Sequence, residues 1–302
     1  MSNQKPGREP KRNFSTSGNE YTTSTFRDRL LLGLHFTLPF LLILLILGAG
    51  VCFAFVNLKR ESTAVSGGAG SSAHGAAPLS KDAFMSRYLE ARGGLANLNG
   101  FSSIQLIGKL RLDGLDYDFT LVKKLQGLAL LTIAFENMDL TIGLSGKGDW
   151  KRVDVRGEGT ETSWIGEEEA GEYSDMREFF DPLTRLAVMK SGKILSLEKE
   201  RFEGQEYLRV ALESDPAKVP VILYVDPEVM TVDVMRESLP DSKERLYRFS
   251  DYRPIRGLPV PFVTEVWVGD KMVNGVYLEK ARPNVCVMSS IFDAPEDLGE
   301  MP

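Results

Sequence analysis

Histidine and cysteine, the residues most often used in nucleophilic catalysis and zinc binding, each occur only twice among the 302 residues. The histidines are His35 and His74, so the part of the chain after residue 80 has no imidazole. Ser-His-Asp catalysis, Cys-His catalysis and a His-based zinc site are therefore excluded there. Cys52 and Cys286 lie in unlike segments, and we expect no disulfide. We expect Cys286, between two valines, to be a buried apolar residue.

Two further clusters could do chemistry, one acidic and one rich in glycine. The acidic spacing does not fit an EF-hand loop, so we expect a solvated loop leading into a helix. The glycines match neither G-x-G-x-x-G nor a P-loop and are typical of turns. The clusters are Glu167, Glu168, Glu169, Glu172 and Asp175, and Gly143, Gly146 and Gly148. The sequence thus predicts no catalytic residue, no metal site and no cofactor.

Apolar side chains in alternating runs remain as candidates for a binding site. On predicted neighbouring strands they share one concave face, where they either form an ordinary core or line a cavity for an apolar ligand. Alternation leaves both alternatives open, and a single bulge would invert the face. The candidates on strands are Leu110, Phe119, Leu121, Ile133, Phe135, Leu140, Ile142 and Trp150, and those on a covering helical segment are Phe179, Phe180 and Leu183.

The elements that would position these residues are mostly short strands. Ser80 is a good N-cap for a helix over residues 81–92. Alternating runs follow, and Asp113-Gly114 and Glu136-Asn137 predict tight turns between them. Further runs continue to about residue 281. Many antiparallel strands joined by turns predict one large curved sheet, partly or fully closed, in a mainly β (α+β) domain.

Residues 174–190 have a different texture, with apolar residues at helical spacing. Pro182 interrupts this region, so a single straight helix is not expected. Asp181 can cap a second helical piece that has Pro182 at its first position. We expect these helical pieces to cover the open face of the sheet.

The chain before the domain has three parts. Residues 1–29 are polar and basic and predict a disordered tail. Residues 30–58 contain no Asp, Glu, Lys or Arg and are long enough to cross a membrane. Residues 59–79 are rich in Gly, Ser and Ala and predict a flexible tether with a reach on the order of 25 Å. The domain then occupies residues 80–302.

Flanking charges predict how the apolar segment is oriented. Lysines and arginines crowd the tail, whereas after Lys59 and Arg60 the next one is Lys81. The positive-inside rule therefore places the N-terminus in the cytoplasm and the domain across the membrane. The apolar run is longer than that of a signal peptide and lacks an A-x-A site, which favours an uncleaved anchor. The net charge of −6 argues against nucleic-acid binding.

Several motifs spread along the domain resemble those of the outer-membrane lipoprotein-sorting and carrier proteins (LolA/LolB-like), and they occur in the same order. The most specific is a Ser-Asp-Tyr-Arg run followed by Gly-Leu-Pro-Val-Pro-Phe. The matching segments are residues 91–95, 104–108, 146–150, 202–207, 224–226, 249–253, 257–262 and 291–295.

This resemblance implies a half-open antiparallel β-barrel with helices in its mouth and an apolar cavity that holds acyl chains of lipids or lipoproteins, without enzymatic activity. Carriers of this kind are soluble, and receptors are lipid-anchored. A helical anchor instead favours a fixed station on a bacterial inner membrane, with the domain in the periplasm. The alternative is a structural or assembly partner in a cell-envelope complex, with a filled, ligand-free core.

Overall fold

The structure is a computed structural model that describes residues 79–213, 220–239 and 243–299. The predicted tail, the predicted membrane segment and nearly all of the tether lie outside the described residues, as do both histidines and Cys52. Among the described residues, no helix combines the length and the apolar character needed to cross a membrane.

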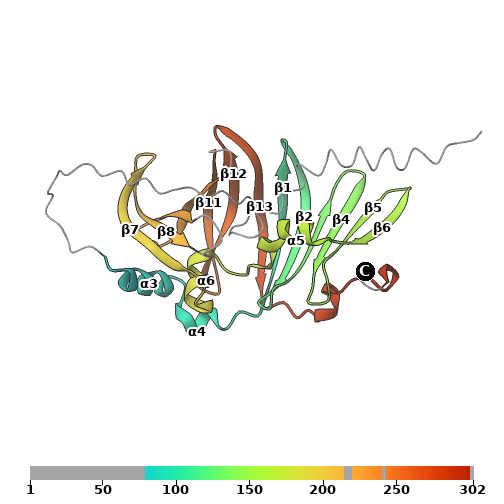
Figure 1. Cartoon of the computed structure of the whole chain (residues 1–302), viewed down its shortest axis with the longest axis horizontal. Helices are drawn as coiled ribbons and strands as arrows, with labels where there is room; N and C mark the ends of the chain where they lie inside the picture. The colour runs from blue at the N-terminus through green and yellow to red at the C-terminus, as the bar shows by residue number, and fades with distance from the viewer. Residues whose placement is uncertain (1–78, 214–219, 240–242, 300–302) are drawn as a thin grey trace, which may run out of the picture. The chain divides into compact units, whose positions relative to one another are not determined.

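Thirteen strands form one antiparallel sheet in the described part of the chain, which confirms the predicted mainly β class (Figure 1). The turns at Asp113-Gly114 and Glu136-Asn137 are also confirmed. The strands are β1 (Ser103–Leu112), β2 (Leu115–Lys124), β3 (Leu128–Ala134), β4 (Met138–Leu144), β5 (Trp150–Val155), β6 (Gly159–Trp164), β7 (Lys193–Phe202), β8 (Gln205–Glu213), β9 (Val221–Val225), β10 (Val232–Ser238), β11 (Glu244–Ile255), β12 (Leu258–Val268) and β13 (Lys271–Pro283).

Two meanders, β1 to β6 and β7 to β13, are joined where β1 pairs with β13. This pairing sets Leu110 opposite Val276, far away in the sequence. The order β6-β5-β4-β3-β2-β1-β13-β12-β11-β10-β9-β8-β7 makes β6 and β7 opposite edges of the sheet. The chain between these two strands, residues 165–192, must therefore cross the whole sheet. We call it the crossover segment.

Within residues 79–299, as far as the structure describes them, helices are few and short. Ser80 Oγ accepts a hydrogen bond from Ala83 N at 3.2 Å, and Asp181 Oδ1 accepts one from Leu183 N at 3.0 Å, which confirms both predicted N-caps. Pro182 occupies the first turn of its helix, as predicted. The helices are α3 (Lys81–Glu90), α4 (Gly94–Leu98), α5 (Glu167–Glu172) and α6 (Pro182–Met189), with 3-10 turns η1 (Ser174–Arg177), η2 (Ser289–Phe292) and η3 (Glu296–Leu298).

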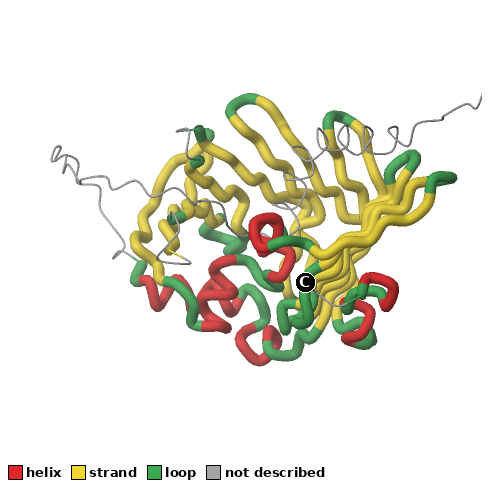
Figure 2. The backbone as a smooth tube through the Cα atoms, turned by 45° about the vertical axis from the view of Figure 1, so that its right-hand side comes forward, coloured by secondary structure: helices red, strands yellow, loops and turns green. Residues whose placement is uncertain are grey.

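The main core lies between one face of the sheet and the helices. Met176 of η1 and Leu183 of α6 are buried with strand residues such as Leu121 in a single cluster, and Tyr88 of α3 joins them. We call this sheet face the concave face and the opposite one the convex face. Figure 2 shows the helices gathered along the curved sheet. The crossover segment and α3 are thus the cover of the concave face.

One strand was not anticipated from the sequence, and two local predictions were wrong. Strand β6 has the sequence Gly-Thr-Glu-Thr-Ser-Trp, which lacks apolar alternation, and it forms because its backbone pairs with β5. The acidic run, expected as a loop, begins with helix α5. Cys286 is exposed, whereas its two valine neighbours are partly buried.

Candidate functional site

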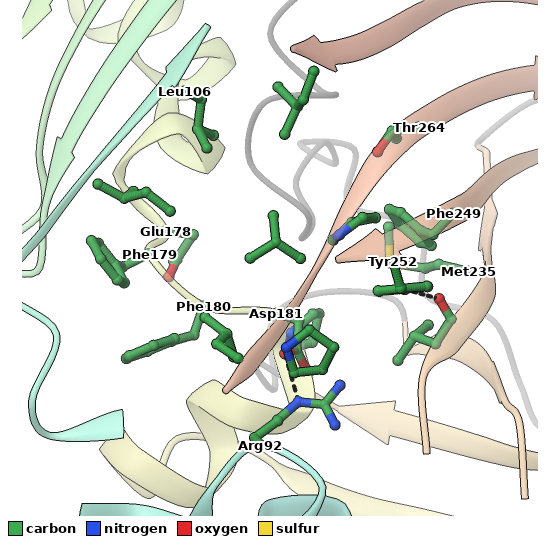
Figure 3. A pocket seen from close by; sticks show the side chains of 18 of the residues that line it. Arg92, Leu106, Glu178, Phe179, Phe180, Asp181, Met235, Phe249, Tyr252 and Thr264 are labelled. Atoms are coloured by element: carbon green, nitrogen blue, oxygen red, sulfur yellow. Dashed lines mark hydrogen bonds and ion pairs between the residues drawn. The ribbon is translucent and has the colours of Figure 1, made fainter. Parts of the chain in front are cut away.

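A cavity of about 150 Å³ lies between the crossover segment and the concave face. Figure 3 shows Phe179 and Phe180 on one side of it and Met235, Phe249 and Tyr252 on the other. Most of its wall is apolar. The apolar lining residues are Ile104, Leu106, Phe179, Phe180, Pro182, Leu223, Val232, Met235, Phe249, Leu258, Pro259, Val260, Pro261, Val276 and Leu278.

The chain between η1 and α6 forms one side of the cavity, and apolar packing holds it in place. The Phe180 ring lies 5.0 Å from that of Phe179 and 6.5 Å from that of Phe101, both in edge-on geometry. Leu98 and Leu258 complete this small cluster. Asp181 then ends the extended stretch by capping α6, so the two phenylalanines and the helix start are placed together.

A buried polar cluster closes one end of the cavity. Arg92, 2% exposed, donates from Nη1 to Met230 O at 2.9 Å, and its guanidinium lies 3.4 Å from the centre of the Tyr88 ring. Its Nε lies 3.5 Å from Asp181 Oδ2, and Tyr88 Oη donates to Asp181 Oδ1 at 2.7 Å. Arg92 thus ties α3, the β9–β10 turn and the start of α6 together.

The ionisation of this cluster follows from its contacts. Burial alone would raise the pKa of Asp181, but Arg92 and hydrogen bonds from Thr184 and Tyr88 bring it below its ordinary value. Asp181 therefore carries a negative charge opposite the arginine. Burial raises the pKa of Tyr88, and the Asp181 charge adds to that effect, so Tyr88 stays a neutral donor.

A second polar group, Lys123, lies on the cavity wall. It belongs to β2, is 4% exposed, and donates from Nζ to Glu178 O at 2.8 Å. Burial lowers its pKa to about 8, although the charges of Asp175 and Glu178 act in the opposite direction. The Glu178 carboxylate in turn pairs with Arg185 of α6. Lys123 thus links the sheet to the crossover segment through a buried hydrogen bond.

The predicted site residues divide into two groups. Phe179 and Phe180 line the cavity, and the structure brings them together with β10 to β13. The others lie outside its lining, and most of them fill the core beneath α5 and η1. The core residues are Leu110, Phe119, Leu121, Ile133, Leu140, Ile142 and Leu183, with Phe135 packed against them. Their contact with a ligand stays a prediction.

Trp150 lies on the convex face, contrary to the face assigned to it from alternation. The register pairs Trp150 with Gly143 and pairs the concave-face residue Ile142 with Lys151. Paired residues in an antiparallel sheet share a face, and consecutive residues do not. Trp150 Nε1 donates to Phe292 O of η2 at 2.9 Å, so its partner is the C-terminal segment.

Sequence reasoning missed Arg92 and Lys123 as site residues. Lys123 did carry a signal, because it lies two residues after Leu121 and four after Phe119. This spacing places the lysine on the same face of β2 as these two apolar residues. Arg92 carried none, since it follows helix α3 and its partners Asp181 and Met230 are distant in sequence.

No protein-family model matches the chain, and no curated protein sequence matches it. Solved structures are similar to it at low identity. A DUF1329 family protein from Desulfovibrio piger has a TM-score of 0.48 and 11% identity, over 69% of this chain and 97% of that one. A LolA superfamily protein from Nitrosomonas europaea has a TM-score of 0.47 and 11% identity, over 70% and 97%. MucB, in the MucA/MucB complex of Pseudomonas aeruginosa, has a TM-score of 0.25 and 13% identity, over 72% and 63%. At these values the likeness establishes neither a family nor a function for this chain.

Proposed function

We propose that this protein binds the acyl chain of a lipid or lipoprotein, without enzymatic activity, in the cavity beneath the crossover segment. The curved sheet would act as a half-open barrel, with α3 and α6 in its mouth. Residues 30–58 would anchor the domain to a bacterial inner membrane, N-terminus in the cytoplasm and domain in the periplasm. The observation that supports this proposal is the wall itself, which is apolar apart from a few polar groups.

The size of the cavity sets a condition on binding. A cavity of about 150 Å³ is of the size that holds a single small molecule such as benzene. A whole acyl chain therefore enters only if residues 178–182 move away from the sheet. Burial of on the order of 300 Å² of chain would contribute about 7 kcal/mol before ordering costs, and this gain would oppose the cost of such a movement.

Photocrosslinking tests the proposal. The full chain in a lipid nanodisc would be exposed to a peptide carrying a photoactivatable palmitoyl group, and labelled residues mapped by mass spectrometry. We expect labels on cavity residues. Leu106→Trp should abolish labelling by filling the cavity, whereas Ile107→Trp, on the other face of the same strand, should not. Absence of cavity labels in the unmodified chain would contradict acyl binding.

The packed part of the concave face favours a second candidate, an assembly partner within an envelope complex. Beneath α5 and η1 the concave face is filled by buried side chains, Leu121, Leu131 and Ile133 among them. A filled core is compatible with a role as a protein scaffold as well as with a role as a carrier. Purification of the full chain with a stable envelope protein, unaffected by Leu106→Trp and accompanied by no palmitoyl labelling, would favour this role.

A further inference from the structure

Lys123, on the cavity wall, interrupts the row of apolar side chains on the concave face of strand β2. Phe119, Leu121 and Lys123 point to the concave face, and the cross-strand partner of Lys123, Ile104, also lines the cavity. Lysine is almost never this buried unless polar or anionic groups compensate its charge. The surroundings of Lys123 therefore bear on what the cavity can bind.

The ammonium of Lys123 donates to a backbone carbonyl, that of Glu178, at 2.8 Å. A carbonyl is a neutral acceptor, and an ionised acceptor forms a hydrogen bond roughly twice as strong. The pKa of Lys123, lowered by burial to about 8, still leaves the ammonium mostly protonated at neutral pH. A cation is thus present at the wall of an apolar cavity.

The two carboxylates that line the cavity each face an arginine. Glu178 pairs with Arg185, and Asp181 lies 3.5 Å from Arg92 Nε. Because these arginines already compensate both negative charges, the carboxylates repel an incoming anion less than free carboxylates would.

A third carboxyl group, Asp175, lies in the cover near Lys123. Burial raises the pKa of Asp175 well above its ordinary value, and the carboxylates of Glu237 and Glu178 act in the same direction. Lys123 and Arg185 oppose that rise without cancelling it. Burial thus shifts Asp175 toward its neutral form, which repels an anion less than an ionised carboxylate would.

We infer that the cavity selects a ligand whose polar end is an ionised acid, namely a free fatty acid with its carboxylate at Lys123, over the same chain with a neutral end. This inference rests on the proposed function and makes it more specific. The carboxylate would accept a hydrogen bond from Nζ in place of the Glu178 carbonyl, and the chain would extend between Phe179 and the apolar wall of β10 to β13.

Displacement of the palmitoyl peptide from the full chain tests this inference. Decanoate and 1-decanol have the same chain length and differ at the polar end, and both would be used below the concentration at which decanoate forms micelles. We expect decanoate to suppress labelling at a concentration roughly ten- to hundredfold lower than 1-decanol, the range given by a hydrogen bond to a charged group. Lys123→Met should remove this preference, so that the two concentrations become about equal.

Lys124→Met is the matched control, since the neighbouring Lys124 points to the convex face and donates to Ser289 Oγ at 3.0 Å. It should keep the preference for decanoate. Equal displacement by decanoate and 1-decanol in the unmodified chain would overturn the inference while acyl binding stands. A preference for decanoate that persists in Lys123→Met would overturn it as well. Absence of labelling before any displacement would instead count against the proposed function.

Discussion

Among single residues, Arg92 connects three separate segments around the cavity, namely α3, the β9–β10 turn and the start of α6. It follows α3, stacks on Tyr88, donates to Met230 O and lies beside Asp181. A guanidinium suits this position because its planar fork can donate in several directions while its face lies on an aromatic ring. A lysine could satisfy one of these contacts, but not all of them together.

Replacement of Arg92 should destabilise the fold. Arg92→Met leaves Asp181 and the Met230 carbonyl without their cationic partner. Loss of one partner from a buried pair costs roughly 3–5 kcal/mol, and the partial exposure of Asp181 reduces that to about 2–4 kcal/mol. Urea denaturation followed by circular dichroism measures this change in the free energy of unfolding.

The control for Arg92 is an arginine–carboxylate pair in solvent. Arg253 pairs with Asp251 at 2.6 Å, and both side chains are about half exposed. Arg253→Met should leave the free energy of unfolding close to that of the unmodified chain, because exposed ion pairs contribute little. Equal losses for the two variants would mean that Arg92 does not hold the cover in the way described.

At the scale of elements, the residues of turns and helix caps made local structure predictable. The side of the sheet on which a strand residue lies was harder to predict. Asp113-Gly114 adopts positive φ at both residues, as a tight hairpin requires, and Asp181 caps α6. The face of Trp150 was not predictable, since the loop before it sets the phase of β5 and alternation cannot count residues across a loop. Strand β6 carries polar residues and depends on pairing with β5.

The pairing of β4 with β5 offers a test at this scale. A Cβ at Gly143 would lie 2.2 Å from ring atoms of Trp150, so Gly143→Ala must displace the ring and weaken its bond to Phe292. We expect a loss of about 1–3 kcal/mol, as for other overpacked sites. The free energy of unfolding and the near-ultraviolet circular dichroism of tryptophan report it.

Gly146 provides the comparison for Gly143. It lies in the loop between the same two strands, has nothing within 4 Å of an added Cβ, and does not require positive φ. Gly146→Ala should leave both signals near those of the unmodified chain. A Gly143→Ala variant that behaves in the same way would show that the Trp150 ring is not packed against that glycine.

At the scale of the whole molecule, the cavity is a consequence of topology. It forms because β1 pairs with β13, which places the two edges far apart and makes the crossover segment traverse the concave face. No local sequence pattern predicts that β1 pairs with β13 or that the crossover segment traverses the concave face. The alternation therefore indicated most of the residues that face the core, but not which of them surround a cavity. Phe179 and Phe180 were identified because the apolar spacing of residues 174–190 predicted a segment that covers the sheet.

The stability of the whole fold should also depend on one carboxyl group between cover and sheet. Asp175 is 2% exposed, and its Oδ1 accepts no hydrogen bond from any described residue. Burial, together with Glu237 and Glu178, raises its pKa well above the ordinary value. The folded state therefore holds a proton at Asp175 at pH values where the unfolded chain, with a pKa of about 3.9, has released it.

The sign of the pH dependence follows from this difference. Where the folded state binds more protons than the unfolded state, stability falls as pH rises. The contribution of Asp175 is thus fully present below about pH 4 and is lost as pH rises through the raised pKa.

Asp175→Asn removes the ionisation, so its unfolding free energy should exceed that of the unmodified chain at neutral pH, with the difference shrinking toward pH 4. Urea denaturation across this range measures the difference. Parallel curves for Asp175→Asn and the unmodified chain would mean that Asp175 is ionised in the folded protein.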